Sequence, residues 1–207
     1  MFDTSSKKER ALGVPLQLKP FRSASPKSAI LRRPNRPGQH GAGRRRPPSE
    51  FSQQLSEKQK FRHTYGLREA QMRGIFQKAS KSASSTGPAF MALLERRLDN
   101  VVFRLGIAPS RSVARQVISH GHIQVNGKRV KSSSYQVKVG NTIRIRPESK
   151  DQQLFRELAG KLKTHNAPNW LTVDPASFEG TVKSLPKDLE FPFDISLVVD
   201  YYSKLVK

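Results

Sequence analysis

Cysteine is absent from this chain of 207 residues. Disulfide bonds, thiol catalysis and cysteine-ligated zinc are therefore excluded. Long apolar runs are also lacking, because no stretch approaches the roughly 20 residues that a membrane-spanning helix needs. The opening residues, MFDTSSKKER, contain no apolar segment of the kind found in signal peptides. We therefore expect no secretion signal and no membrane partner.

Acidic side chains are scarce, with 16 against 38 lysines and arginines, and the formal charge is +22. Residues 1–68 and residues 69–164 each carry a balance of +12, whereas residues 165–207 carry −2. So large an excess repels itself unless an anionic partner neutralises it. Nucleic acid is the first candidate partner; an anionic membrane surface is the second and has little support.

Residues 1–48 are rich in proline, glycine and arginine and poor in apolar side chains. A segment of this composition cannot form a packed core of its own. One interpretation is a disordered basic tail. The other, which we favour, is an extended basic arm whose arginine side chains bind phosphates with their planar forks.

Two helices are predicted in the next segment, residues 49–92. Ser49 can cap a helix that runs to about Thr64. A second helix runs from Leu67 to about Ala79. Apolar side chains recur on one side of each helix, which predicts that the two share a core.

The segment of residues 93–149 begins with apolar residues at helical spacing. From Phe90 to Leu105 this spacing predicts a single helix with one buried face. The polar residues between the apolar ones, including Arg97, Asp99 and Asn100, are expected to stay largely outside.

A second helix and several short strands follow. Ser110 is a good N-cap for this helix, and Gly121 ends it. Alternating residues then predict strands, the first two joined at Asn126-Gly127 by a type I′ turn. Further strands are predicted at Tyr135–Val139 and Thr142–Arg146. We expect two helices packed on a small curled antiparallel sheet.

Four short motifs in this segment resemble the S4 RNA-binding domain: Ser110-Arg111, Ala114-Arg115-Gln116, Gly121-His122-Ile123 and Val125-Asn126-Gly127-Lys128. The flanks are similar to the bacterial family of small ribosomal subunit protein S4. PGQHG at 37–41 and EKQKFRHTYGLREAQMRGIF at 57–76 occur in the family's order, and the resemblance extends over residues 31–205. It implies an α+β fold, in which an S4-type domain is inserted into a helical N-terminal domain with a basic extended arm.

The resemblance also implies domain boundaries. Residues 1–48 are the arm, and residues 93–149 are the S4 RNA-binding domain. Residues 49–92 and 150–207 together form the helical domain with its C-terminal tail. The tail is expected to begin with a short helix at Leu154–Leu162.

The function that the resemblance implies is that of a structural constituent of the small ribosomal subunit. It includes primary binding of 16S-type rRNA at a helical junction in the 5′ domain and nucleation of assembly of the subunit body. It also includes contributions to translational accuracy and to the channel through which messenger RNA enters.

The implied partners are small-subunit rRNA, neighbouring small-subunit proteins (protein five above all) and mRNA. The implied location is the cytoplasmic ribosome or an organellar one. An RNA-modifying enzyme or a non-ribosomal RNA-binding factor with an S4 domain is the alternative.

Two features suggest other chemistry. Arg97-Leu98-Asp99 resembles the catalytic string of pseudouridine synthases but lacks the glycine that precedes it there, so we favour a surface charge at Asp99. His120 and His122 lack a third metal ligand, and turn packing and phosphate contact remain equal alternatives for them. Some family members hold zinc with an N-terminal cysteine cluster, which this chain lacks. We expect no enzyme activity, no metal and no cofactor.

The candidate RNA-binding residues are basic or polar side chains of the arm, the paired helices and the central segment. Replacing Arg111 and Arg115 by glutamate is expected to weaken RNA binding without unfolding. The full set is Arg32, Arg33, Arg36, Gln39, His40, Lys58, Lys60, Arg62, Arg68, Arg73, Arg96, Arg97, Arg111, Arg115, His122, Lys128 and Arg129.

Overall fold

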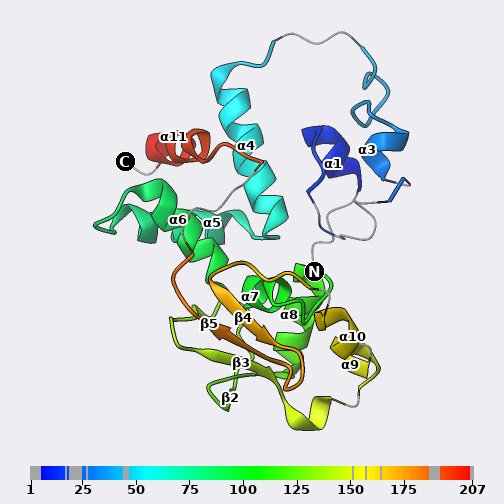
Figure 1. Ribbon diagram of the computed structural model, residues 1–207. Helices are drawn as coiled ribbons and strands as arrows, with labels where there is room; N and C mark the ends of the chain where they lie inside the picture. The colour runs from blue at the N-terminus through cyan, green and yellow to red at the C-terminus, as the bar shows by residue number, and fades with distance from the viewer. Residues whose placement is uncertain are drawn as a thin grey trace. The chain divides into compact units, whose positions relative to one another are not determined.

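The computed structural model describes residues 6–16, 18, 25–26, 28–43, 47–150, 152–156, 158–163, 165–186 and 192–205. The chain forms two compact units, residues 1–90 with 190–207 and residues 91–189 (Figure 1). The first, the helical unit, is built from helices in its described part. The second, the sheet unit, combines helices with an antiparallel sheet. The predicted α+β fold class is confirmed.

The described helices of the helical unit are drawn from both ends of the chain. They are α1 (Ser6–Leu12), α3 (Ala29–Arg32), α4 (Glu50–Thr64), α5 (Glu69–Ser80), the start of α6 (Thr86–Glu95) and α11 (Ile195–Leu205). The Ser49 hydroxyl accepts a hydrogen bond from the amide of Ser52 and caps α4, as the sequence predicts.

Aromatic side chains form the core of the helical unit. The ring of Phe76 lies 5.1 Å from that of Tyr202 and 5.9 Å from that of Phe90, measured between centroids. The Tyr202 hydroxyl donates to Glu69 over 2.9 Å. Burial and then this carboxylate raise the pKa of Tyr202, so the hydroxyl remains a donor. Through these contacts α11 packs on α5, which lies much earlier in the sequence.

Part of the arm that the sequence predicts to be extended is helical instead. In α3 the amide of Arg32 donates to the carbonyl of Ser28 over 3.1 Å. Beyond this helix, the guanidinium of Arg10 donates to backbone carbonyls of Arg33, Asn35 and Arg36. These bonds give the arm hydrogen-bond partners within the unit. Arg44, Arg45 and Arg46, further arginines of the arm that are expected to bind phosphates, lie outside the described residues.

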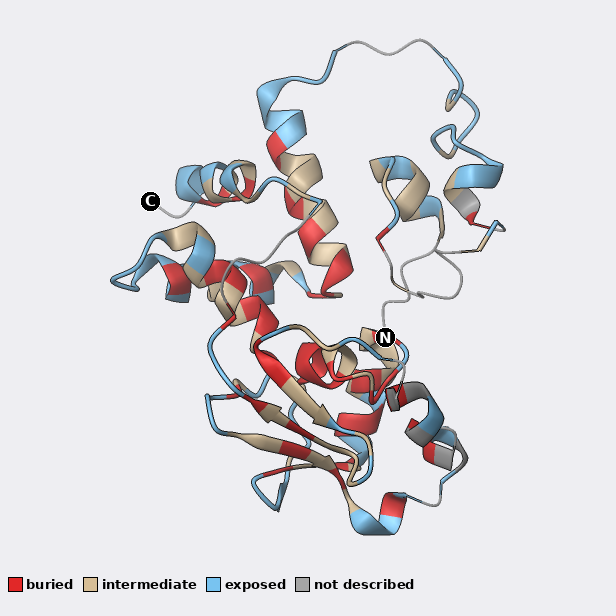
Figure 2. Cartoon of the chain, viewed as in Figure 1, coloured by how far each residue is buried: buried red, intermediate tan, exposed pale blue. Residues whose placement is uncertain are grey.

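The sheet unit orders its five described strands β2-β1-β3-β5-β4, with each neighbouring pair antiparallel. Buried residues, red in Figure 2, gather where α7 and α8 meet the sheet. The elements are α7 (Leu98–Arg104), α8 (Arg111–His120), β1 (Ile123–Val125), β2 (Lys128–Arg129), β3 (Thr142–Ile145), η1 (Pro147–Ser149), α9 (Gln153–Arg156), α10 (Leu158–Lys163), β4 (Leu171–Asp174) and β5 (Glu179–Val182).

Buried and half-buried residues alternate along β1 and β3, so one face of the sheet covers α7 and α8. Ile123, Ile143 and Ile145 are buried and belong to the core formed with α7 and α8. Between β1 and β2, Asn126 and Gly127 have φ angles of 50° and 78°, the positive values that a type I′ turn requires. The predicted hairpin is therefore confirmed.

The predicted domain boundary after residue 149 is wrong. β5 pairs with β3, and β4 pairs with β5, so both strands extend the sheet instead of returning to the helical unit. Phe155 and Trp170 are buried in the same core. The helical prediction for Leu154–Leu162 is confirmed by α9 and α10, but these helices also belong to the sheet unit.

The single helix predicted from Phe90 to Leu105 is also wrong, because the chain leaves helical geometry between α6 and α7. Arg97 is extended, with φ −65° and ψ 135°, and forms an isolated bridge with Gln136. The amide of Leu98 donates to the carbonyl of Tyr135 over 2.9 Å, a bond that replaces one within a helix. The strand predicted at Tyr135–Val139 is therefore reduced to this single bridge.

Candidate nucleic-acid interface

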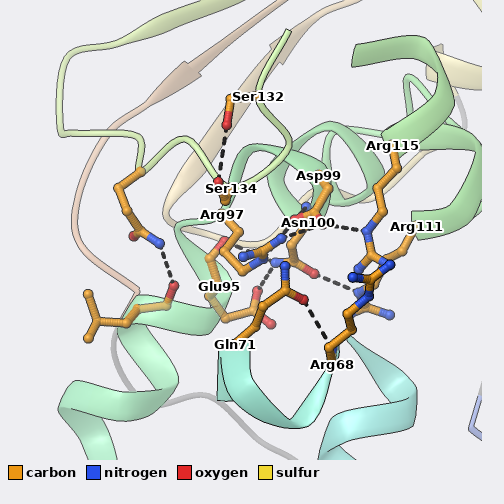
Figure 3. Close-up of polar contacts among 12 residues, drawn as sticks. Arg68, Gln71, Glu95, Arg97, Asp99, Asn100, Arg111, Arg115, Ser132 and Ser134 are labelled. Carbon is orange, nitrogen blue, oxygen red and sulfur yellow. Dashed lines mark hydrogen bonds and ion pairs between the residues drawn. The ribbon is translucent and has the colours of Figure 1, made fainter. Parts of the chain in front are cut away.

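The break between α6 and α7 buries a carboxylate that organises two arginine side chains. Asp99 is 1% exposed. Its two oxygens accept hydrogen bonds of 3.1 and 3.0 Å from Arg97 in a bidentate pair, and Oδ2 also accepts one of 2.7 Å from Nε of Arg115 (Figure 3). Planar guanidinium groups favour this fork geometry. Asp99 thus joins the start of α7 to α8.

A second buried carboxylate, Glu95, organises the other half of the cluster. It accepts two hydrogen bonds of 3.1 Å from Arg104 and one of 2.8 Å from the side-chain amide of Asn100. The amide oxygen of Asn100 accepts in turn from Nε of Arg111 over 2.8 Å. Arg111 also lies over the ring of Phe103, with 4.6 Å between the guanidinium carbon and the ring centroid.

Together these contacts define the arginine platform: Glu95, Arg97, Asp99, Asn100, Arg104, Arg111 and Arg115, of which Figure 3 labels all but Arg104. The platform contains four guanidinium groups and two carboxylates, so it carries two positive charges in excess. Removal of the Asp99 carboxylate would leave the buried guanidinium of Arg97 without its partner. The platform can therefore hold guanidinium groups in fixed orientations while its net charge still attracts phosphate.

The platform corrects the outward placement predicted for Arg97, Asp99 and Asn100. All three are buried, because the break in the helix turns this segment toward α8. Lys58, also expected on the surface, is 3% exposed and pairs with Glu69 over 3.0 Å. The structure therefore does not place Arg97 and Lys58 where they can meet a phosphate directly.

The end of α8 is closed by Arg129. Its guanidinium donates to the carbonyls of Gly121 and His120 over 3.1 and 3.0 Å. Gly121 has φ 80°, a backbone conformation that favours glycine, and a Cβ there would lie 2.1 Å from Nε of Arg129 and displace its guanidinium. Arg129 thus fixes the turn while its side chain remains exposed.

His122 is a packed side chain at the same turn. Its Nδ1 lies 2.9 Å from the Ser149 hydroxyl, and its ring meets Phe155 edge-on. Burial first, then the charges of His120, Arg129 and Arg146, lower the pKa of His122. A neutral, hydrogen-bonded ring agrees with the packing alternative considered for this histidine.

The remaining predicted residues belong to both units and divide by exposure. Six are half-buried: Lys60, Arg62, Arg96, Arg111, Arg115 and His122. Nine are exposed: Arg32, Arg33, Arg36, Gln39, His40, Arg68, Arg73, Lys128 and Arg129.

The sequence did not indicate Glu95 or Asn100 as site residues. Their roles depend on contacts with Arg104 and Arg111, which the helix break and the α7–α8 packing create. One signal was present, since two carboxylates lie among several arginines in a short stretch, and buried carboxylates are usually paired. Among the described residues, no group of three or more His, Asp or Glu side chains could hold a metal ion. In the same part of the chain, no helix is long and apolar enough to cross a membrane.

Comparison with known proteins assigns both parts of the chain. Residues 96–143 match the S4 domain, so the segment that carries most of the arginine platform is an S4-domain module. Residues 3–95 match the N-terminal domain of ribosomal protein S4/S9.

Relatives at high identity extend the match over nearly the whole chain. Small ribosomal subunit protein uS4 of Thermus thermophilus is 46% identical over 197 residues, 94% of each chain. The protein of the same name from Roseiflexus castenholzii is 47% identical over 180 residues, 84% of this chain and 87% of the relative. That from Chloroflexus aurantiacus is 43% identical over 203 residues, 96% of each. The chain belongs to the uS4 family of small ribosomal subunit proteins.

Proposed function

We propose that this protein is a structural constituent of the small ribosomal subunit and binds its rRNA through basic surfaces of both units. The observation that carries the proposal is the arginine platform, in which buried carboxylates orient guanidinium groups and leave positive charge in excess. The relatives named as small ribosomal subunit proteins support the same role.

A folded RNA junction suits this surface better than a uniform duplex. The deep, narrow major groove of A-form RNA is closed to side chains, so proteins recognise RNA by backbone shape, 2′-hydroxyl groups and unstacked bases. Guanidinium groups in fixed orientations fit phosphates in one particular spatial arrangement. A junction supplies such an arrangement, whereas a regular duplex repeats one spacing.

The finer proposal follows the family. The protein binds 16S-type rRNA at a helical junction in the 5′ domain, nucleates assembly of the body, and contributes to translational accuracy and to the channel through which mRNA enters. Its protein neighbours are other small-subunit proteins, with protein five as the first candidate. The proposed location is the ribosome of a bacterial cytoplasm, with an organellar ribosome as the alternative.

The enzyme alternative has lost its basis. The chain belongs to a family named for a component of the small ribosomal subunit, and the relatives match it over nearly their whole length. Asp99, the candidate for catalysis, is buried and held by Arg97 and Arg115. The other alternative, a non-ribosomal RNA-binding factor with an S4 domain, is tested by sedimentation. Such a factor is released from the small subunit by a high-salt wash, whereas a structural constituent stays bound.

Filter binding with the full chain tests the proposal. The probes are an RNA containing the 5′-domain junction of small-subunit rRNA and a perfect duplex of equal length. We expect preference for the junction and, with about eight phosphates neutralised, a loss of affinity on the order of a thousandfold or more between about 50 and 200 mM salt. Equal affinity for the two RNAs contradicts the proposal.

A further inference from the structure

The arm of the helical unit carries exposed arginines on a backbone that has little regular structure. Arg32 ends α3, and Arg33 and Arg36 follow it, with all three side chains exposed. A flexible chain that binds phosphates loses conformational entropy when it orders. A residue that holds the arm in place before binding therefore raises its affinity for RNA.

Arg10 makes the contacts that such a residue needs. From α1, its Nε donates to the carbonyls of Arg33 and Asn35 over 2.9 and 3.0 Å, and one terminal nitrogen lies 3.3 Å from the carbonyl of Arg36. In the described part of the chain, no backbone amide donates to any of these three carbonyls. One side chain thus fixes the arm backbone at three positions.

The backbone beyond Arg36 is held from its other side. Gly38, with φ 104°, turns the chain, and the amide of Gly41 donates to the Gly38 carbonyl over 3.2 Å. A Cβ on Gly41 would lie 2.0 Å from the carbonyl oxygen of Arg36, so this approach is open only to glycine. The Arg36 carbonyl is therefore enclosed between the Arg10 side chain and the Gly41 backbone.

We infer that Arg10 is a positioning residue for RNA binding: it clamps the backbone of residues 33–36 so that the side chains of Arg32, Arg33 and Arg36 are presented together to phosphates. This inference rests on the proposed function. Only arginine suits the role, because its planar fork has five donors and no acceptor. The three carbonyl oxygens offset part of its charge.

The test compares Arg10→Ala with Lys7→Ala in the full chain. Lys7 is exposed on the same helix, so its replacement removes the same charge without removing the clamp. Filter binding to the junction RNA is expected to show Arg10→Ala weaker than Lys7→Ala by about tenfold or more, as the loss of charge-assisted hydrogen bonds predicts. Arg10→Lys, which retains the charge without the fork, is expected to fall short of the wild type.

A double-mutant cycle separates positioning from direct contact. If Arg10 positions the arm, Arg36→Ala costs less affinity in the Arg10→Ala background than in the wild type. If Arg10 itself binds a phosphate, the two losses add, and each lowers the salt slope by about one charge. Amide ¹⁵N relaxation of residues 35 and 38–41 without RNA provides a second measurement, because the clamp predicts increased motion in Arg10→Ala and not in Lys7→Ala.

Three results overturn the inference: equal losses for Arg10→Ala and Lys7→Ala, wild-type binding by Arg10→Lys, or additive losses in the cycle. The failure of the proposed function has a different signature. In that case the wild-type protein itself shows no preference for the junction RNA, whatever the state of Arg10.

Discussion

Asp99→Asn is the change that most sharply separates an organised platform from a simple excess of charge. The substitution keeps the size of the side chain and raises the net charge by one. A charge excess alone therefore predicts tighter RNA binding. The platform predicts weaker binding, because Arg115, which is partly exposed, loses the carboxylate that orients it.

The magnitude follows from burial. The Arg97 and Asp99 side chains are 5% and 1% exposed, and removal of one partner from a buried ion pair costs about 3–5 kcal/mol. Asparagine retains one oxygen acceptor, which recovers about 1 kcal/mol. We therefore expect the free energy of unfolding to fall by about 2–4 kcal/mol. Urea unfolding followed by circular dichroism measures this change, and filter binding to the junction RNA measures the affinity.

Glu148→Gln is the matched control. It raises the net charge by the same amount in the same unit, but Glu148 is exposed and pairs with Arg146 at the surface. We expect no loss of stability and binding at least as tight as in the wild type. An Asp99→Asn variant that is as stable as the control and binds RNA as tightly would show that Asp99 does not organise the platform.

Three further outcomes are expected. Gly180→Ala should destabilise the sheet unit by about 1–3 kcal/mol, because its Cβ would lie 2.4 Å from Cδ2 of Leu105. Gly74→Ala in α5, where a Cβ meets nothing within 4 Å, should stabilise the helical unit by about 0.5–1 kcal/mol. If the urea midpoints of Gly180→Ala and Gly74→Ala do not differ, the close contact between Gly180 and Leu105 is contradicted. Burial and then Lys8 lower the pKa of His63 to about 4, so the unfolded chain binds the extra proton first, and stability is lost as pH falls from about 6.5 toward 4. After allowance for its partial exposure, His63→Gln should remove about 1 kcal/mol of the loss between pH 7 and pH 5, whereas His40→Gln, at an exposed site, should leave the full loss.

The structure also revises the expectation for Arg111→Glu with Arg115→Glu. Charge layout alone predicts weaker RNA binding in a folded protein. Because Arg115 pairs with buried Asp99, a glutamate there would place two carboxylates together in a buried site, which is strongly unfavourable. We now expect this double variant to lose stability as well as affinity, and its binding cannot be interpreted without an unfolding measurement.

Local signals in the sequence were sufficient wherever a single residue type decides the geometry. Ser49 and Ser110 cap helices with their hydroxyls, as predicted. The hairpin at Asn126-Gly127 forms because both residues tolerate positive φ. Capping and tight turns depend on neighbours within a few residues, so a sequence displays them directly.

Features that depend on distant partners were not predictable in the same way. The break between α6 and α7 exists because the segment around Tyr135 supplies backbone partners to Leu98 and Asp99. The buried place of Asp99 follows from that break, and helical spacing alone assigned it to the surface. β4 and β5 were likewise missed as strands. β4 pairs with β5, and the pair joins the sheet only because β5 pairs with β3, a segment far away along the chain.

Sedimentation of small ribosomal subunits from the source organism tests whether this protein is a constituent of the subunit that rRNA holds in place. After a high-salt wash, quantitative mass spectrometry measures the amount of this chain relative to the other proteins of the subunit. A ribosomal constituent held by rRNA remains in stoichiometric amount. Release of the chain by the wash, or its presence in only a fraction of the particles, would contradict the account.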